Sequence, residues 1–453
     1  MTPRLGLLVA VFLFVARAAH AVTLTVCASG CDYTTVQACA TAAVAADTCE
    51  VRADSVGGSK TYSENVTVAN SGTAGNPITF SVRSGDTVTI AGTITLTSQD
   101  YITFGGSASG QGFRVVPTSG HGIVSASGSN NLIIRNNYIS AQAINSVCIR
   151  FGATTPLTDI IIANNEITHC GWGISGTGGP ATQLYANEML IEGNDISESI
   201  DMLLVGGTHI VMRNNTLHTV DVQATGCTPA PSCHVDLIQT SGNTLTESLI
   251  ENNVGYDCID TTGNCHFFLV RNVSAPDADT IIGRYNFGTN LDTGAFQFGG
   301  VDDEVPNGHA YNNTFAWETT TLDDVGGCIG FTNAANGVAV NNICYNVRKE
   351  LSALSARSPT YFSPAGFGSH NIAFITGFTG EWLAPYLDEP TYATLKNQDP
   401  LFTNYPTSGK IGTNSPAYNA GTPLTTAVGA GSMSTALVVA DARNNASQGG
   451  GGY

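Results

Sequence analysis

The residues of this chain best suited to chemistry lie in its middle third, where carboxylate, imidazole and guanidinium groups follow one another on successive apolar runs. His234 and Asp236 lie two positions apart, so on an extended strand they share a face. Asp201 lies in the preceding run, and His266 and Arg271 lie in the following one. Such groups, brought together, can take up, hold and return a proton. We therefore predict His234, Asp236, His266 and Arg271 as catalytic residues.

A recurring asparagine marks the elements that must position these residues. It follows a short apolar run each time, at intervals of 28, 29, 21, 38, 33, 27, 29 and 29 residues. A period of this length with strand-like and turn-like residues indicates a solenoid of stacked coils. A third apolar run lies between copies, so each coil should hold three strands, which is typical of an all-β parallel β-helix. The recurring residues are Asn137, Asn165, Asn194, Asn215, Asn253, Asn286, Asn313, Asn342 and Asn371.

This asparagine column predicts a turn and a ladder. We expect the asparagines to take up the left-handed backbone of the turn, which Asn tolerates better than most residues. Stacked about 4.8 Å apart, their side-chain amides should bond to one another. Two positions earlier, Glu192, Arg213, Glu251 and Arg284 alternate in sign on successive coils. This alternation predicts an ion ladder, so these arginines are poor catalytic candidates.

The first residues resemble a secretory signal. A charged start, an apolar stretch from Leu5 to Ala16 and a small-x-small site ending at Ala21 are typical of a signal peptide. No later apolar window is long enough to span a bilayer. We divide the chain into a signal peptide (1–21), a parallel β-helix with an N-terminal cap (22–375) and an irregular closing segment (376–453). The expected location is extracellular, periplasmic or on the cell surface.

The 12 cysteines favour disulfides, because an even number in an exported chain rarely serves metal or redox chemistry. Sequence alone leaves their connectivity open, and pairing of nearest neighbours is our expectation. The neighbouring pairs are Cys27 and Cys31, Cys39 and Cys49, Cys148 and Cys170, Cys227 and Cys233, Cys258 and Cys265, and Cys328 and Cys344.

The charge balance narrows the possible partners. Only 11% of residues are charged and the formal net charge is −18. A chain without a basic patch has little to offer nucleic acid or an anionic membrane. Neither nucleic acid nor an anionic membrane is therefore an expected partner.

The chain resembles a known group at both ends of the repeats. The stretch from Cys27 to Gln37, followed by Ser71 to Phe80, is similar to the entry into secreted right-handed parallel β-helices of the pectate-lyase-like superfamily. The stretch from Asp399 to Phe402, and Gly412 to Gly421 after it, resembles the tail of such helices in bacterial surface-anchored proteins. The resemblance implies a right-handed helix of about ten coils. It also raises the expectation of an anchoring segment following the present sequence.

The resemblance implies a carbohydrate site on the sheet formed by the third runs. We accordingly expect a monomer whose partner is a polysaccharide or a cell-surface glycan. The string from His234 to Gln239 is similar to one in many carbohydrate-active β-helices. A uronate lyase needs a group that neutralises the carboxylate, a base and an acid. On this interpretation Arg271 is the neutraliser or base and His234 transfers a proton. Asp201 and Asp236 are calcium ligands or orienting groups.

Further residues complete the predicted site. Trp172 is placed either to stack on a sugar ring or to plug a coil, and we include it with Asp201 and Gln239 in the substrate-binding set. The acidic cluster Asp302, Asp303 and Glu304 is the candidate calcium site, calcium being the only cofactor we expect.

Several alternatives stay open. A glycoside hydrolase would use Asp201 and Asp236 as a carboxylate pair. The string around Asp236 could also simply cap a loop in a non-catalytic surface or adhesion protein. None of the four lysines falls between Asn137 and Asn342, which argues against a lysine-based lyase. The enzyme hypothesis requires His234, Asp236, His266 and Arg271 to converge on an open groove.

Overall fold

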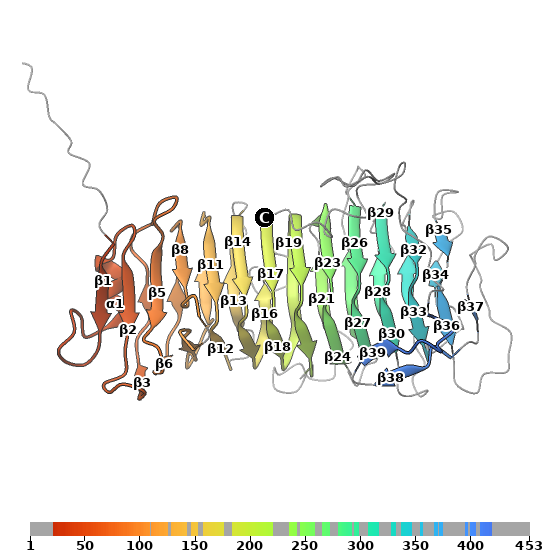
Figure 1. Cartoon of the computed structure of the whole chain (residues 1–453). Helices are drawn as coiled ribbons and strands as arrows, with labels where there is room; N and C mark the ends of the chain where they lie inside the picture. Colours follow the sequence, from red (N-terminus) through yellow and green to blue (C-terminus); the bar gives the residue numbers. More distant parts are fainter. Residues whose placement is uncertain are drawn as a thin grey trace, which may run out of the picture.

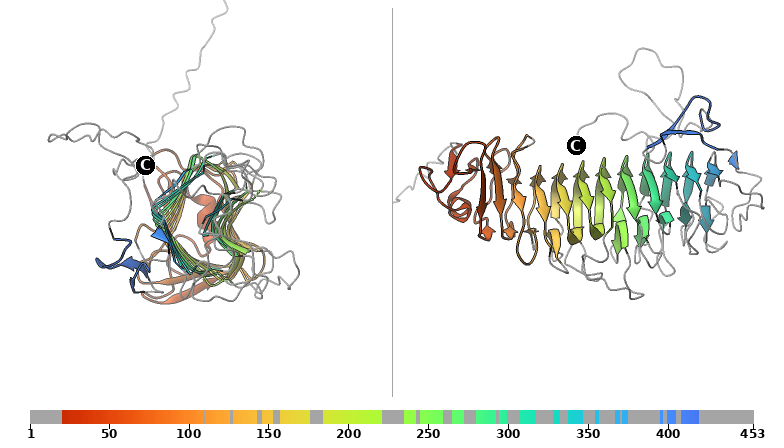
Figure 2. Two further views of the ribbon diagram at one scale, coloured as in Figure 1. Left: turned by 90° about the vertical axis from the view of Figure 1, so that its right-hand side faces the viewer. Right: turned by 90° about the horizontal axis from the view of Figure 1, so that it is seen from below.

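The chain winds into a long solenoid of parallel strands (Figure 1). Each coil contributes one strand to each of three faces, here named sheets A, B and C, which surround a common interior in the end-on view of Figure 2. This arrangement confirms the all-β parallel β-helix predicted from the repeat. The structure is a computed structural model that describes residues 21–108, 110–125, 128–142, 146–152, 157–175, 184–220, 235–241, 245–258, 265–271, 280–291, 294–298, 307–316, 328–331, 337–346, 354–356, 367–369, 371–374, 395–396, 399–404 and 408–418.

The strands of each sheet follow one another in chain order, with β19 passing from sheet C into sheet A. Sheet A comprises β1 (Thr23–Val26), β2 (Thr48–Val51), β5 (Ile78–Val82), β8 (Ile102–Phe104), β11 (Leu132–Arg135), β14 (Leu157–Ala163), β17 (Leu184–Glu192), β19 (Ser199–Arg213), β22 (Leu245–Thr246), β23 (Ser248–Glu251), β26 (Thr280–Arg284), β29 (Asn307–Tyr311), β32 (Val338–Val340) and β35 (Phe367–Ser369). Sheet B comprises β3 (Ser59–Tyr62), β6 (Thr87–Ile90), β9 (Arg114–Val115), β12 (Tyr138–Ser140), β15 (Glu166–Thr168), β18 (Asp195–Ser197), β20 (Thr216–His218), β24 (Val254–Cys258), β27 (Phe287–Leu291), β30 (Thr314–Ala316), β33 (Ile343–Tyr345), β36 (Ile372–Phe374) and β37 (Leu395–Lys396). Sheet C comprises β4 (Val66–Thr67), β7 (Ile94–Thr95), β10 (Ile123–Ser125), β13 (Val147–Phe151), β16 (Cys170–Ser175), the first part of β19, β21 (Val235–Ser241), β25 (Cys265–Arg271), β28 (Gly294–Phe298), β31 (Ile329–Phe331) and β34 (Leu354–Ala356).

The recurring asparagines form a buried ladder at the corner between sheets A and B. Asn215 is representative: its Nδ2 donates to Asn253 Oδ1 and to the Ile191 carbonyl, each at 3.0 Å. Its Oδ1 accepts from the backbone N–H and the Nδ2 of Asn194, also at 3.0 Å. The same pattern links the column from Asn137 to Asn371. The predicted ladder is confirmed, and it satisfies polar groups that the turn would otherwise leave buried and unpaired.

We expected the ladder asparagine itself to adopt the left-handed backbone of the turn, and this expectation is wrong by one position. The left-handed residue of the turn is the one before the ladder asparagine, as at Asn136 (φ 59°), Asn214 (φ 56°) and Tyr285 (φ 55°). Asn therefore occupies the ladder position for its hydrogen bonds and not for its backbone. The number of coils also differs slightly from the expected ten.

Two of the ion pairs expected from the alternating charges are present along sheet A, while no pair between Arg213 and Glu251 is found among the described residues. Arg213 pairs with Glu192 on the neighbouring strand, and Arg284 pairs with Glu251 at 2.8 Å. The Arg213 pair is partly exposed, whereas the Arg284 side chain is almost completely buried. The column therefore stabilises the stacking of coils, as predicted, and the two arginines differ in burial.

Sheet C bends in the middle of each strand, so that two consecutive residues face the interior. A methyl group on Gly255 of sheet B would touch the side chains of Leu237 and Phe267. A methyl group on Gly283 of sheet A would instead meet the Phe296 ring. Phe296 is level with Phe268, and Phe268 directly follows Phe267 on its strand. Two consecutive positions of the strand thus face the interior. The residues on either side of this inward pair therefore face outward, and these two outward rows carry the candidate site.

A compact cap closes the N-terminal end. The helix α1 (Val36–Ala42) begins at Thr35, whose side chain accepts the Ala38 N–H, and the Glu64 carboxylate accepts the N–H groups of Val36 and Gln37. No described helix is long and apolar enough to cross a bilayer. This short helix was not part of the sequence prediction.

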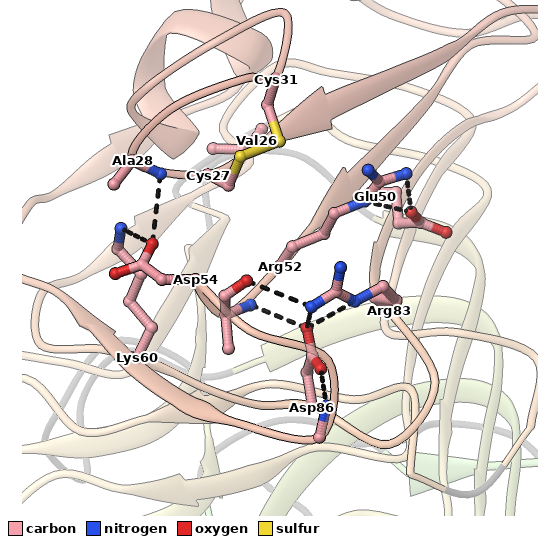
Figure 3. A network of polar contacts seen from close by, with 12 residues as sticks. Val26, Cys27, Ala28, Cys31, Glu50, Arg52, Asp54, Lys60, Arg83 and Asp86 are labelled. Carbon is pink, nitrogen blue, oxygen red and sulfur yellow. Dashed lines mark hydrogen bonds and ion pairs between the residues drawn. A yellow bond between two sulfur atoms is a disulfide. The ribbon is translucent and has the colours of Figure 1, made fainter.

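A polar network fastens the cap to the first coils (Figure 3). Asp86 accepts the N–H groups of Ala53 and Gly57, each at 2.8 Å, and pairs with Arg83. Lys60 pairs with Asp54, which also accepts the Ala28 N–H. A buried carboxylate held in this way links segments that are distant in sequence.

Five of the six expected disulfides are present, and each joins nearest neighbours in sequence. The sixth pair, Cys227 and Cys233, lies outside the described residues. The described disulfides are Cys27–Cys31, Cys39–Cys49, Cys148–Cys170, Cys258–Cys265 and Cys328–Cys344.

The C-terminal segment folds back onto the solenoid. The antiparallel hairpin of β38 (Phe402–Asn404) and β39 (Ser408–Ile411) lies beside the last strands of sheet B in Figure 1. Phe402 packs against Tyr345 of β33, with ring centroids 5.3 Å apart. Part of the closing segment thus shields the side of sheet B near its end.

Candidate functional site

Four of the predicted site residues form one row across adjacent strands of sheet C. Trp172 of β16 is level with Asp201 of β19, and Asp236 of β21 is level with His266 of β25. Side-chain and backbone contacts join the two halves of the row, since the Asp236 N–H donates to Asp201 Oδ1 at 3.0 Å. The strands β16, β19, β21 and β25 are neighbours along the solenoid in Figure 1. The structure therefore places these residues beside one another, as the alignment of the third runs in the sequence predicted.

Hydrogen bonds run continuously through this row. Trp172 Nε1 donates to Asp201 Oδ2 at 3.2 Å. Asp236 Oδ1 accepts the backbone N–H of His266 at 3.0 Å and lies 2.8 Å from His266 Nδ1. A carboxylate at this distance holds the proton of a neutral imidazole on Nδ1, which leaves Nε2 as the basic nitrogen. The row can therefore orient a histidine for proton transfer.

The row is covered, which differs from the open groove that we expected. Asp236 is 0% exposed, His266 4% and Asp201 6%, and Trp172 is the partly exposed member. Periodicity places side chains on a face but does not say what covers them. In a setting with little water, the hydrogen bonds between these groups are electrostatically stronger than they would be at the surface.

Arg271 lies away from this row. It is the last residue of β25 and is level with Ser241, five residues beyond His266 on the same strand. At about 3.3 Å per residue this separation is about 16 Å along the backbone. The Arg271 side chain and the whole of His234 lie outside the described part of the chain, so their predicted roles remain hypotheses.

Gln239 faces outward in the second row, level with Leu204 and Leu269. It is buried, and its position three residues after Asp236 places it beside the first row and not within it.

The predicted calcium cluster of Asp302, Asp303 and Glu304 lies outside the described residues. Within the described residues, no group of three or more His, Cys, Asp or Glu side chains is placed to hold a metal ion. Asp201 uses both of its oxygens, and Asp236 uses Oδ1, to accept N–H groups. This donor set fits hydrogen bonding better than a shell of calcium ligands.

Sequence reasoning missed two basic residues on the same outward side of sheet C, towards the N-terminal end. His121 precedes β10, and Arg150 lies in β13; their side chains approach to 2.6 Å. Burial and the neighbouring Arg150 lower the pKa of His121 below its ordinary value. Continuing the third-run alignment back to Ile123–Ser125 would have placed them near Trp172.

Comparison with known families supports the architecture of this region. Residues 101–274 match the family described as the right handed beta helix region. The chain contains a right-handed β-helix region. All four residues of the row fall within the matched β-helix, and the resemblance to pectate-lyase-like helices is thereby supported at the level of fold.

Solved structures similar to this β-helix include three carbohydrate-active enzymes. An alginate lyase from Paenibacillus sp. str. FPU-7 is 16% identical with a TM-score of 0.41, covering 67% of this chain and 96% of its own. A lacto-N-biosidase from Eubacterium ramulus is 12% identical with a TM-score of 0.45, covering 77% and 66% respectively. A pectin methylesterase from Aspergillus niger is 14% identical with a TM-score of 0.33, covering 67% and 91%. Likenesses of this size concern the fold alone. Comparison with curated proteins gives no match.

Proposed function

We propose that this protein is an extracellular β-helix enzyme that binds and depolymerises an acidic polysaccharide, acting as a uronate lyase. The observation that carries the proposal is the contact of Asp236 Oδ1 with His266 Nδ1 at 2.8 Å. The same oxygen holds the His266 backbone N–H, so both the position and the tautomer of the imidazole are set. Five disulfides in the described chain favour an oxidising, extracellular location.

In the proposed elimination His266 Nε2 is the base. It takes the proton from the sugar carbon that carries the carboxylate. The electron pair of that C–H bond forms a double bond to the neighbouring ring carbon, whose bond to the glycosidic oxygen breaks. The leaving oxygen takes a proton from the imidazolium just formed or from water. Asp236 stabilises the imidazolium, and Asp201 holds Asp236 through its backbone N–H.

Two further parts of the proposal come from the sequence. We assign His234 to proton transfer near the leaving group, Arg271 to a substrate carboxylate further along the strand from His266, and calcium to neutralisation of the reacting carboxylate if the acidic cluster at 302–304 binds it. Trp172, the partly exposed member of the row, is the proposed contact for a sugar ring.

A glycoside hydrolase is the second candidate. Asp201 and Asp236 are buried carboxylates on neighbouring strands, which lie about 4.8 Å apart. Carboxyl groups about 5 Å apart suit a retaining hydrolase. The engagement of Asp201 and Asp236 with N–H donors favours orientation over direct attack, so we rank this candidate second.

One screen tests these candidates together. The full chain is incubated with a panel of uronate-containing and neutral polysaccharides, with calcium or with a chelator. A lyase yields chain ends with a new double bond that absorbs ultraviolet light, whereas a hydrolase yields reducing ends without this absorbance. Cleavage of no polysaccharide would contradict the enzyme proposal and favour a non-catalytic surface protein.

A further inference from the structure

A second polar cluster lies on the outward side of sheet C, on the N-terminal side of Trp172. Ile123 is level with Ile149, so His121 and Val147, each two residues earlier, are neighbours across the same two strands. Arg150 is level with Ser175 on the next strand. The cluster formed by His121, Arg150 and Ser175 therefore spans three successive strands of the β-helix.

The hydrogen bonds of His121 leave an electrostatic conflict inside this cluster. The Val147 N–H donates to His121 Nδ1 at 3.0 Å, so the proton of the neutral imidazole is on Nε2. That nitrogen lies 2.6 Å from Arg150 Nη1, which also carries protons. Two donors thus face each other with no acceptor between them. The lowered pKa of His121 agrees with a neutral ring beside the guanidinium.

Arg150 differs in this respect from four other arginines of the chain. Arg52, Arg83, Arg213 and Arg284 each pair with a carboxylate. Within the described residues, Arg150 has its recorded polar contact with the imidazole alone. A partly buried guanidinium held against a second donor is a group prepared for an external acceptor.

Ser175 supplies an independent observation of the same kind. Its hydroxyl is fully buried and has no hydrogen-bond partner among the residues that the structure describes. It is directly level with Arg150 on the neighbouring strand, about 4.8 Å away. A buried hydroxyl without a partner is costly, and an oxygen-bearing ligand beside Arg150 would offset this cost.

We propose that His121, Arg150 and Ser175 form a subsite for the carboxylate of an acidic sugar. The fork of Arg150 binds the two carboxylate oxygens, and His121 Nε2 and the Ser175 hydroxyl donate to them. The subsite rests on the proposed function, because it assumes a polysaccharide lying along sheet C. Asp201 lies on the second strand beyond Arg150, about 10 Å across the sheet and three residues earlier along its strand, so the subsite would hold a sugar at a distance from the reacting one.

The test is calorimetric binding of a short uronate oligomer to the full chain and to four variants. Arg150→Gln removes the charge and keeps the length of the side chain, and Ser175→Ala removes the hydroxyl. Arg213→Gln, in the ion ladder of sheet A, is the matched control. The carboxyl-reduced oligomer and a sulfated neutral oligomer are the additional ligands. Thermal unfolding of each variant is measured alongside, and Arg150→Lys serves if Arg150→Gln fails to fold.

We expect Arg150→Gln to weaken uronate binding about 10- to 100-fold and Ser175→Ala by less, with no change for Arg213→Gln. Arg150→Lys should bind with intermediate affinity, because it keeps the charge and loses the fork. Neither Arg150 variant should affect the carboxyl-reduced oligomer. Equal binding of the uronate by wild type and Arg150→Gln would overturn the subsite.

The outcomes separate the subsite from the catalytic proposal. Cleavage of uronates by both wild type and Arg150→Gln, with equal KM, overturns the subsite and leaves the lyase standing. Uronate binding that depends on Arg150 without any turnover supports the subsite and contradicts the lyase. Tighter binding of the sulfated oligomer than of the uronate would overturn the assignment to a carboxylate.

Discussion

Asp236 Oδ1 accepts two hydrogen bonds from His266, one from its backbone at 3.0 Å and one from its imidazole at 2.8 Å. The first fixes where the strand places His266, and the second fixes which ring nitrogen carries the proton. Asp236→Asn keeps the shape and removes the charge that supports the imidazolium. We expect kcat on the uronate substrate to fall about 10²- to 10⁴-fold in steady-state kinetics, with a smaller change in KM.

A second aspartate–histidine pair provides the control for this change. His218 Nε2 lies 2.9 Å from Asp195 Oδ1 on sheet B, where the Asp195 side chain is exposed. Asp195→Asn should leave the kinetics unchanged. A comparable loss of kcat in both variants would indicate a general effect on folding and argue against a special role for Asp236.

The asparagine ladder should stabilise the solenoid more than the turn residues beside it do. Asn215→Ala removes two donated and two accepted hydrogen bonds in a buried site. We expect it to lower the free energy of unfolding by about 3–5 kcal/mol in urea titrations.

Asn214 is the neighbouring control, because it is the left-handed turn residue (φ 56°). Asn214→Gly relieves that conformation and should change the free energy of unfolding by less than about 1 kcal/mol. An equal loss of stability in the two variants would contradict the claim that the ladder hydrogen bonds stabilise the solenoid more than the turn residues do.

The two arginines of the ion ladder should differ in what they contribute. Arg284→Ala leaves Glu251 largely buried without this cation, and we expect a loss of about 3 kcal/mol in thermal or urea unfolding. Arg213→Ala breaks a partly exposed pair with Glu192 and should cost about 0–1 kcal/mol. The reverse order would contradict the link between burial and pair energy.

The N-terminal cap should weaken in acid through Asp86. Burial raises the pKa of this carboxyl, but hydrogen bonds from Ala53, Arg83 and Gly57 together lower the pKa by more than burial raises it. The net pKa therefore lies below the ordinary value of 3.8. A lowered folded pKa means that the carboxylate stabilises the fold above the unfolded value, and this contribution is lost as the pH falls through the folded pKa.

Asp86→Asn should therefore cost about 1–3 kcal/mol near neutral pH in urea unfolding. The gap to wild type should narrow as the pH falls below 3.8. A gap that stays constant across this range would show that the charge of Asp86 does not contribute.

The repeat predicted most of the scaffold, because its period fixes both the coil and the face of each residue. It correctly placed Asp201 beside Asp236 and His266 in the next coil. It placed Arg271 in the right coil but could not give its distance along the strand from His266, since alignment by coil does not measure position within the strand. The repeat also did not predict that the outward row is buried, because burial depends on tertiary contacts that a sequence period does not describe. His121 and Arg150 were missed because their apolar runs lie before the part of the chain with the densest reactive residues.

The most direct test of the central claim compares wild type with His266→Gln on the uronate polymer that the screen identifies. Gln keeps a hydrogen bond to Asp236 and cannot serve as a base. We predict that wild type releases product with ultraviolet absorbance and that His266→Gln releases it at least about 100-fold more slowly, with unfolding temperatures that agree closely. Release of the unsaturated product at the wild-type rate by His266→Gln would contradict the account.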